Sequence, residues 1–304
     1  MTDRTKGILS MIAVCVIWGL STVYYRALSH VPPAEVLSHR TIWSLVLFGG
    51  VLAYQGRLGL LRGALGSTAH LWRIVAAAVM ISANWGLFIW AVQNGHVVES
   101  SLGYYIFPLV AVVMGVIVFR ETLMPSQWLA VVIAAVAVAL LTWGLGATPW
   151  VSLALAVTFG LYGVLKKALP LGPVVSVAAE VAVLAPFALI WLALVHSGAV
   201  GTREGSVHFG TDWQTTLLLI GAGPLTAIPL MLFARAARSV DLATVGVVGY
   251  LNPTIQFIVA VAVFGEVFTK WHAIAFAMIW TALAIYSAAA YRRASARRAM
   301  IPRP

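Results

Sequence analysis

The chain has 304 residues, of which 62% are apolar and 9% are charged. Soluble domains carry about 25% charged residues, so this composition excludes an ordinary soluble protein and indicates a polytopic membrane protein. The net charge of +10 does not indicate nucleic-acid binding, because the basic residues cluster at the ends of apolar segments. The one cysteine, Cys15, lies inside an apolar run, so the sequence predicts no disulfide, metal site or cofactor site.

Ten apolar runs are long enough to cross a bilayer, which takes about 20 helical residues. The runs are 7–28, 34–54, 72–93, 99–119, 127–145, 149–165, 174–196, 213–234, 242–264 and 271–291. Their connections are short, except 55–71 and 197–212, and none has room for a soluble domain. The alternating pattern of barrel strands is absent. The sequence therefore predicts an all-α integral membrane protein.

The basic residues indicate its orientation. With ten spans, both termini and the even-numbered connections share one side, and that side holds 15 of the 19 basic residues, all but Arg26, Arg40, Arg203 and Lys270. The positive-inside rule then predicts that both termini are cytoplasmic. Residues 292–304 form a basic tail, which we expect to contact anionic lipid.

The two halves of the chain repeat each other. At an offset of 145, "YYIFPLVAVVMGVIVFRE" (104–121) aligns with "GYLNPTIQFIVAVAVFGE" (249–266), and the tripeptide "AEV" occurs at 34–36 and 179–181. Residues 1–145 and 146–291 would each hold five spans. Because five is odd, the second half enters the membrane from the opposite face, and this inverted repeat is typical of secondary transporters.

Three stretches resemble a known family. These are "EVLSHRTIWS" (35–44), "NWGLFIWAVQNGHVVESSLGYYIFPL" (84–109) and "FGEVFTKWHAIAFAMIWTALAIY" (264–286). They are similar to the RarD group of permeases, in the EamA branch of the drug/metabolite transporter superfamily. The resemblance implies two five-helix EamA repeats, an inner-membrane location and transport of small metabolites or drugs. The chain has Phe107 where the family pattern has Asn.

Three polar residues begin the second span, where charge is costly. Glu35 and His39 share a helix face, and Arg40 is displaced from Glu35 by about 140°. An ionisable group in a span costs about 2.5–3.5 kcal/mol on insertion scales and usually faces a cavity or a partner. Glu35 and His39 could carry protons or bind substrate, with Arg40 attracting an anionic group. Alternatively, Glu35 could pair with Arg26 while Arg40 extends toward the interface.

Matched features of the two repeats suggest a path through the membrane. Glu180 is the counterpart of Glu35 and would place a carboxylate near the opposite mouth. Pro108 and Pro253 fall in the middle of matched spans, where proline bends a helix and frees a carbonyl. Such paired interruptions point to a central binding site. Further candidates for its walls, for which helix packing is the alternative, are Trp18, Asn84, Trp85, Tyr104, Tyr105, Tyr250, Asn252 and Gln256. For Glu121 and Glu266 we expect interfacial ion pairs with Arg120 and Lys270.

The sequence therefore predicts a secondary transporter that exports small metabolites or drug-like molecules by alternating access. Coupling of this export to protons is one option for its driving force. It carries no H-E-x-x-H, phosphate loop or G-x-S-x-G motif, so we do not expect an enzyme. The alternatives are a membrane-embedded enzyme acting on a lipid or amphiphile and a non-transporting sensor. The expected partners are a small-molecule substrate and the bilayer, with small-residue helix faces that permit a homodimer.

Overall fold

The computed structural model describes residues 3–120, 122–146, 149–199, 207–240, 245 and 248–299, and these residues contain helices and no strands. The helices are α1 (Asp3–Ala27), α2 (Pro33–Tyr54), α3 (Leu58–Gly66), α4 (Thr68–Gln93), α5 (Val97–Phe119), α6 (Pro125–Leu145), α7 (Trp150–Lys167), α8 (Pro173–His196), α9 (Trp213–Ser239), α11 (Leu251–Ile258) and α12 (Lys270–Ala299), with a π-helical turn η1 (Val259–Val263) directly after α11. Glu121, expected in an ion pair, lies outside the described residues.

Nine of the helices in the described part of the chain are long and apolar enough to cross a membrane. They correspond to nine of the ten predicted spans. The remaining one, predicted at 242–264, is represented by a shorter apolar helix at Leu251–Val263. The connection 55–71 contains the short helix α3, which the sequence pattern did not predict. The last helix continues through the basic tail as far as Ala299.

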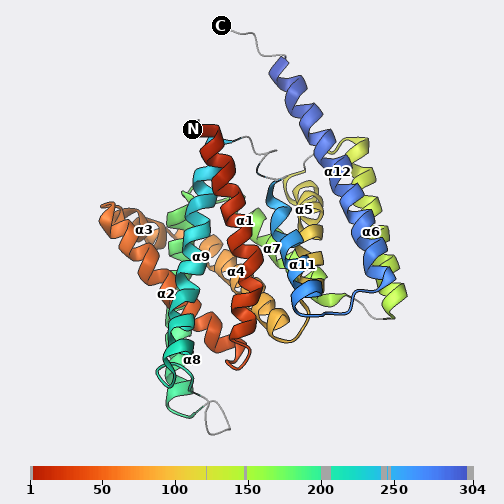
Figure 1. The fold of residues 1–304 in the computed structure, drawn as a ribbon. Helices are drawn as coiled ribbons and strands as arrows, with labels where there is room; N and C mark the ends of the chain where they lie inside the picture. Colours follow the sequence, from red (N-terminus) through yellow and green to blue (C-terminus); the bar gives the residue numbers. More distant parts are fainter. Residues whose placement is uncertain are drawn as a thin grey trace.

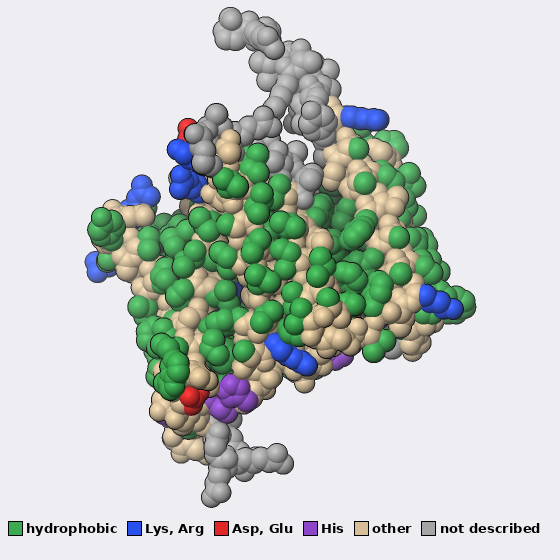
Figure 2. Space-filling model, viewed as in Figure 1, with side chains coloured by type: hydrophobic (Ala, Val, Ile, Leu, Met, Phe, Trp, Pro, Cys, Tyr) green, Lys and Arg blue, Asp and Glu red, His purple; other side chains and the backbone are tan. Residues whose placement is uncertain are grey.

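The surface of the molecule fits a bilayer. Side chains such as Val46, Ile117 and Phe187 are more than half exposed although they are apolar, which is costly in water and favourable in lipid. Figure 2 shows hydrophobic side chains across the visible face, with charged side chains toward its upper and lower edges. Helix α1 begins and α12 ends at the same end of the molecule (Figure 1).

The helices pack in a definite set of pairs. Helix α1 packs against α9 and α11, and α2 packs against α8 and α9. Helix α7 packs against α4 and α5, and α4 also contacts α8. Helices α6 and α12 pack against each other at one side of the bundle (Figure 1).

Glycines allow two of these crossings to be close. A Cβ on Gly223 of α9 would lie 2.5 Å from the carbonyl carbon of Trp43 in α2. A Cβ on Gly103 of α5 would lie 2.8 Å from the carbonyl oxygen of Ser152 in α7. Both positions need a residue without a side chain, because small residues are what allow membrane helices to approach backbone to backbone.

Candidate functional site

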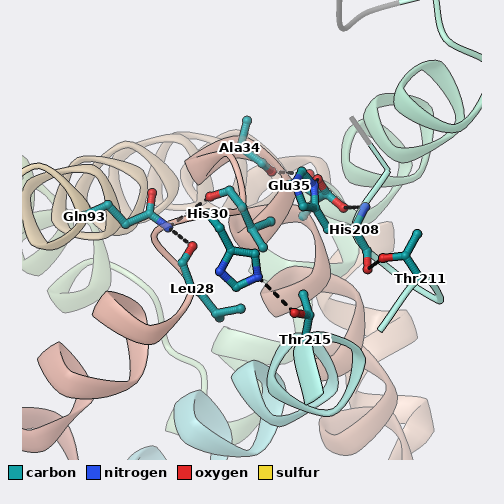
Figure 3. A network of polar contacts seen from close by, with 10 residues as sticks. Leu28, His30, Ala34, Glu35, Gln93, His208, Thr211 and Thr215 are labelled. Carbon is teal, nitrogen blue, oxygen red and sulfur yellow. Dashed lines mark hydrogen bonds and ion pairs between the residues drawn. The ribbon is translucent and has the colours of Figure 1, made fainter. Parts of the chain in front are cut away.

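A buried carboxylate lies at the end of the bundle that carries the α1–α2 turn. Glu35 is 1% exposed, and its Oε2 lies 2.9 Å from Nδ1 of His208 in the segment before α9. Its Oε1 accepts a longer bond of 3.3 Å from the backbone N–H of His208 (Figure 3). This contact ties the start of α2 to the segment that enters α9, which is a connection of 173 residues along the chain.

A second histidine extends this cluster. Nε2 of His30 lies 2.9 Å from the hydroxyl of Thr215 (Figure 3), and the rings of His30 and His208 are 6.0 Å apart. Asp212 caps α9 by accepting from the backbone N–H of Thr215 at 2.8 Å. The backbone N–H of Thr215, followed by its side chain, lowers the pKa of the exposed Asp212 carboxyl from its ordinary value.

Arg26 does not pair with Glu35, so that alternative for Glu35 is wrong. Its guanidinium donates to the backbone carbonyls of Val92 and Gln93 at the end of α4, at 3.1 and 3.2 Å. The Gln93 side chain donates in return to the carbonyls of Leu28 and Val31, at 2.8 and 3.1 Å. These reciprocal bonds join the α1–α2 turn to the end of α4.

His39 is buried, and its environment comes from the same segment that binds Glu35. Its ring is stacked on Phe209, with centroids 4.6 Å apart, and Trp43 lies 6.5 Å from the same ring. Within the described residues, Nε2 of His39 and Nε1 of Trp43 have no hydrogen-bond partner although both atoms are buried. The Glu35 carboxylate hydrogen-bonds to His208 and not to His39. A shared role of Glu35 and His39 in carrying protons or binding substrate stays a prediction.

Arg40 is 6% exposed, so the alternative in which it extends to the interface is wrong. Its guanidinium carbon lies 4.0 Å from the ring centre of Trp85 and 5.8 Å from that of Tyr25. These are cation–π contacts, which are stronger where water is excluded. Its Nε has no hydrogen-bond partner among the described residues.

Asn84 occupies the junction of three helices. Its Nδ2 donates to the carbonyl of Leu155 at 3.0 Å and to the hydroxyl of Thr158 at 2.9 Å, both in α7. Its Oδ1 accepts from the hydroxyl of Tyr104 in α5 at 3.2 Å. The amide is fully buried, so these bonds fix α4, α5 and α7 relative to one another.

Glu180, inside α8, is equally well satisfied. It is fully buried and accepts from Nζ of Lys166 at 2.7 Å, from the hydroxyl of Tyr162 at 3.0 Å and from that of Ser176 at 3.0 Å. The Lys166 ion pair stabilises the α7–α8 hairpin, because a buried carboxylate needs a compensating charge.

The two matched prolines differ in their positions. Pro108 lies inside α5, as expected. Pro253 lies in the first turn of α11, where its missing N–H removes no helical bond, and its carbonyl accepts from Ser101 at 2.8 Å.

Glu266 caps the start of α5. Its carboxylate accepts from the backbone N–H groups of the first residues of α5 at 2.9 and 2.7 Å, in place of the expected pairing with Lys270.

The remaining candidates lie on α1, on α5, and on α11 or the residue directly before it. Tyr105 and Tyr250 are stacked with ring centres 6.3 Å apart. Gln256 donates to Asn252 along one face of α11 at 3.1 Å, and its Oε1 is buried without a partner among the described residues. The ring of Trp18 in α1 lies 6.5 Å from that of Phe233 in α9.

Sequence reasoning missed His208 and Phe209, which are the residues that close this end of α2. Both lie in the connection 197–212, which has no periodic apolar pattern to mark an inward-facing residue. The partners of Glu180 carried a usable signal, because Tyr162 and Lys166 share a helix face at i and i+4.

A bundle of long apolar helices with buried, paired carboxylates and a buried arginine is the architecture of a multi-pass membrane protein. Residues 5–143 match the model of the EamA-like transporter family. The RarD protein of Escherichia coli is 35% identical over 282 residues, which cover 92% of this chain and 93% of that protein. The chain belongs to the EamA-like transporter family, in its RarD group.

Two further relatives and one solved structure are similar to nearly the whole chain. An uncharacterized transporter of Pseudomonas aeruginosa is 40% identical, with 98% of this chain and 97% of that protein covered. The RarD protein of Streptomyces exfoliatus is also 40% identical, with 98% and 93% covered. A solved crystal structure shares the fold, with a TM-score of 0.58 and 16% identity over 93% of this chain and 97% of that one.

Proposed function

We propose that this protein is a secondary transporter that exports small metabolites or drug-like molecules by alternating access. In this proposal two inverted halves, residues 1–145 and 146–291, expose a shared path first to one compartment and then to the other. The observation that carries the proposal is the exchange symmetry of the helix packing. In this proposal both termini of the chain face the cytoplasm.

The offset of 145 residues relates α1 to α7, α2 to α8, α4 to α9, α5 to α11 and α6 to α12. Under this exchange, the α1–α9 contact corresponds to α7–α4 and the α1–α11 contact to α7–α5, and all four pairs occur. The contacts α2–α8, α5–α11 and α6–α12 correspond to themselves and occur as well. A two-fold relation between the halves requires this pattern.

The exchange relates two groups of helices, which we take as two bundles; they contact each other mainly through α2–α8, α5–α11 and α2–α4. Helices α1, α2, α9 and α11 are joined by contacts, as are α4, α5, α7 and α8. Each bundle takes helices from both halves of the sequence. Rocking of one bundle against the other is the motion we propose for alternating access, because packed bundles move as rigid bodies between discrete arrangements.

The polar contacts support a state that is closed at the α1–α2 turn. The bonds between Arg26 and α4, together with those of Gln93 to the turn, cross from one bundle to the other. Opening this end requires them to break. The contact of Glu35 with His208 joins α2 to the segment that enters α9, within one bundle. Protonation of Glu35 would remove the carboxylate charge and weaken this contact, because hydrogen bonds to a charged group are the stronger ones. We therefore assign proton sensitivity to this pair.

The names of relatives suggest the solutes to try first. One relative, 28% identical over 96% of this chain, is named a chloramphenicol-sensitive protein RarD of Pseudomonas aeruginosa. Amphenicols and a pool of cell metabolites are therefore rational first candidates for flux.

The test is flux of these solutes in proteoliposomes, with and without a pH gradient. The proposal expects solute to cross unchanged, faster than in protein-free vesicles, with a rate that responds to the gradient. Conversion of solute into product in detergent solution, without any gradient, would instead indicate an enzyme. Absence of both flux and product across the metabolite pool would reject transport.

A further inference from the structure

The guanidinium of Arg40 is buried in the described bundle, and its Nε has no described hydrogen-bond partner. We infer that Arg40, backed by Trp85 and Tyr25, binds the negatively charged group of a small organic anion with a planar apolar body. This inference rests on the proposed transport function and narrows its substrate class from small molecules in general to organic anions.

Arg40 remains charged, because arginine is not deprotonated in proteins. It lies in the membrane-spanning helix α2 and is 6% exposed. A charge in this position is normally paired with another side chain or lines a functional path. The nature of its surroundings therefore decides what Arg40 is for.

The chain itself supplies no counter-charge to Arg40 among the described residues. Of nine acidic residues in the sequence, three lie outside the described part of the chain: Glu121, Glu204 and Asp241. The other six have different partners: Asp3 pairs with Lys6, Glu35 with His208, Glu99 with His96, Glu180 with Lys166, while Asp212 and Glu266 accept backbone N–H groups at helix starts.

The aromatic neighbours contact the flat face of the guanidinium and leave its N–H edge available to an acceptor. Trp85, with its ring centre 4.0 Å from the guanidinium carbon, and Tyr25, at 5.8 Å, interact through their π faces. Cation–π contacts leave the N–H donors at the guanidinium edge free to bind an acceptor. The buried Nε is one such donor without a described partner. A carboxylate or another oxyanion accepts from this edge through two parallel bonds.

Two further buried ring nitrogens without a described partner lie on the same stretch of α2. Nε1 of Trp43 is buried without a described partner, as is Nε2 of His39. At about 100° per residue, positions 39, 40 and 43 fall within roughly 100° of the helix circumference. One helical stretch thus carries two unpartnered donors, Nε of Arg40 and Nε1 of Trp43, beside the His39 ring nitrogen. The missing partner is therefore rich in acceptors, as an oxyanion is.

The aromatic rings indicate the body of the ligand. Besides Trp85 and Tyr25, the ring of Phe88 packs edge-on against both Tyr25 and Tyr104, at 5.9 and 5.8 Å. Flat aromatic walls favour flat apolar groups, whereas the single cation fixes the charged end. Aromatic carboxylic acids combine both properties.

The experiment is equilibrium binding of radiolabelled benzoate, phenylacetate and indole-3-acetate to the full chain in lipid nanodiscs, each compared with its amide. Acid and amide share size and shape and differ in charge. We expect at least one acid to bind at least ten-fold more tightly than its amide. Arg40→Gln should weaken that acid at least ten-fold, and Arg40→Lys, which keeps the charge without the planar fork, should weaken it less.

Arg73 provides a matched control. Its guanidinium also lies over an indole, that of Trp72 at 5.1 Å, but on a part of α4 where Trp72 is 58% exposed. Arg73→Gln should leave acid binding unchanged. The acid–amide comparison in the unmodified chain does not depend on any variant folding.

The inference is overturned if no acid in the panel binds better than its amide, or if Arg40→Gln, folded by gel filtration, binds acid as the unmodified chain does. Flux in proteoliposomes separates this failure from failure of transport. If acid binding fails in this way, neutral solutes that still cross the membrane would leave transport standing while the anion site is rejected. Acid binding that depends on Arg40, without flux of any solute, would support the anion site and reject transport.

Discussion

The crossing of α2 and α9 allows a quantitative test of the packing. In Gly223→Ala, the new Cβ would lie 2.5 Å from both the carbonyl carbon and the Cβ of Trp43 and 2.8 Å from the backbone nitrogen of Ser44. Ordinary van der Waals contact begins at 3.4 Å. Because the atoms of Trp43 and Ser44 nearest the new methyl are backbone atoms or a Cβ, no rotamer change relieves the overlap, and the helices must move apart by somewhat less than 1 Å.

Overpacking of this kind costs about 1–3 kcal/mol, while replacing glycine by alanine in a helix returns up to about 1 kcal/mol through propensity. Gly50 of α2 separates the two effects, since nothing lies within 4 Å of a Cβ at that position. We expect Gly50→Ala to be neutral or slightly stabilising. Gly223→Ala should be less stable than Gly50→Ala by about 1–3 kcal/mol.

The measurement is thermal unfolding of both variants in the same detergent, followed by the fraction that remains monodisperse in gel filtration. At about 2–4 °C per kcal/mol, the difference between the variants should reach several degrees. Equal melting temperatures would refute the close approach of α2 and α9, and with it the packing from which the two bundles are inferred.

Three further predictions concern charged groups. Glu35→Gln should keep the hydrogen bond to His208 but remove the pH dependence of flux, and a pH profile identical to that of the unmodified chain would reject the proton role. Glu180→Gln leaves the cation of Lys166 without its charged partner and should lower the free energy of unfolding by about 3 kcal/mol. The double variant that also carries Lys166→Met should recover stability. If Glu180→Gln melted at the same temperature as the unmodified chain, that would argue against the buried pair. The folded-state pKa of Asp212 is lowered, so its contribution to stability is present above its unfolded pKa and is lost as pH falls through the folded value. Asp212→Ala should therefore reduce the melting temperature at neutral pH and have little effect in acid. An equal effect at both pH values would contradict the charge argument.

Most of the helices could be predicted from the sequence, because a run of about 20 apolar residues matches the thickness of the hydrocarbon core when it is helical. The helix α3 was missed since nine residues in a connection give too short a pattern. The span expected at 242–264 corresponds to a helix that starts at Leu251 in the described residues, with Pro253 in its first turn. Proline in an apolar run is equally compatible with a bend and with a start.

The candidate site was predictable only in part. Glu35, Asn84 and Glu180 stood out because polar groups are rare in spans, and all three are buried and bonded. Their partners were harder to find: the contact of Glu35 with His208 spans 173 residues, and no local pattern encodes such a distance. The burial of Arg40 was also not evident, because a long side chain near a helix end can equally reach the interface.

The central claim is that two bundles move so that the ends of the path open in turn. The sole cysteine, Cys15, makes a labelling background straightforward through Cys15→Ser. Spin labels on the exposed Ser29 and Asn94 report on the end at the α1–α2 turn, and labels on the exposed Ala168 and Arg235 report on the opposite end. Pulsed electron–electron distance measurements follow each pair in nanodiscs with and without a transported solute.

The account predicts opposite changes: as solute is added, the Ser29–Asn94 distance lengthens in the same fraction of molecules in which the Ala168–Arg235 distance shortens. Distances that stay fixed at both ends while flux proceeds, or that lengthen together, would contradict alternating access in this protein.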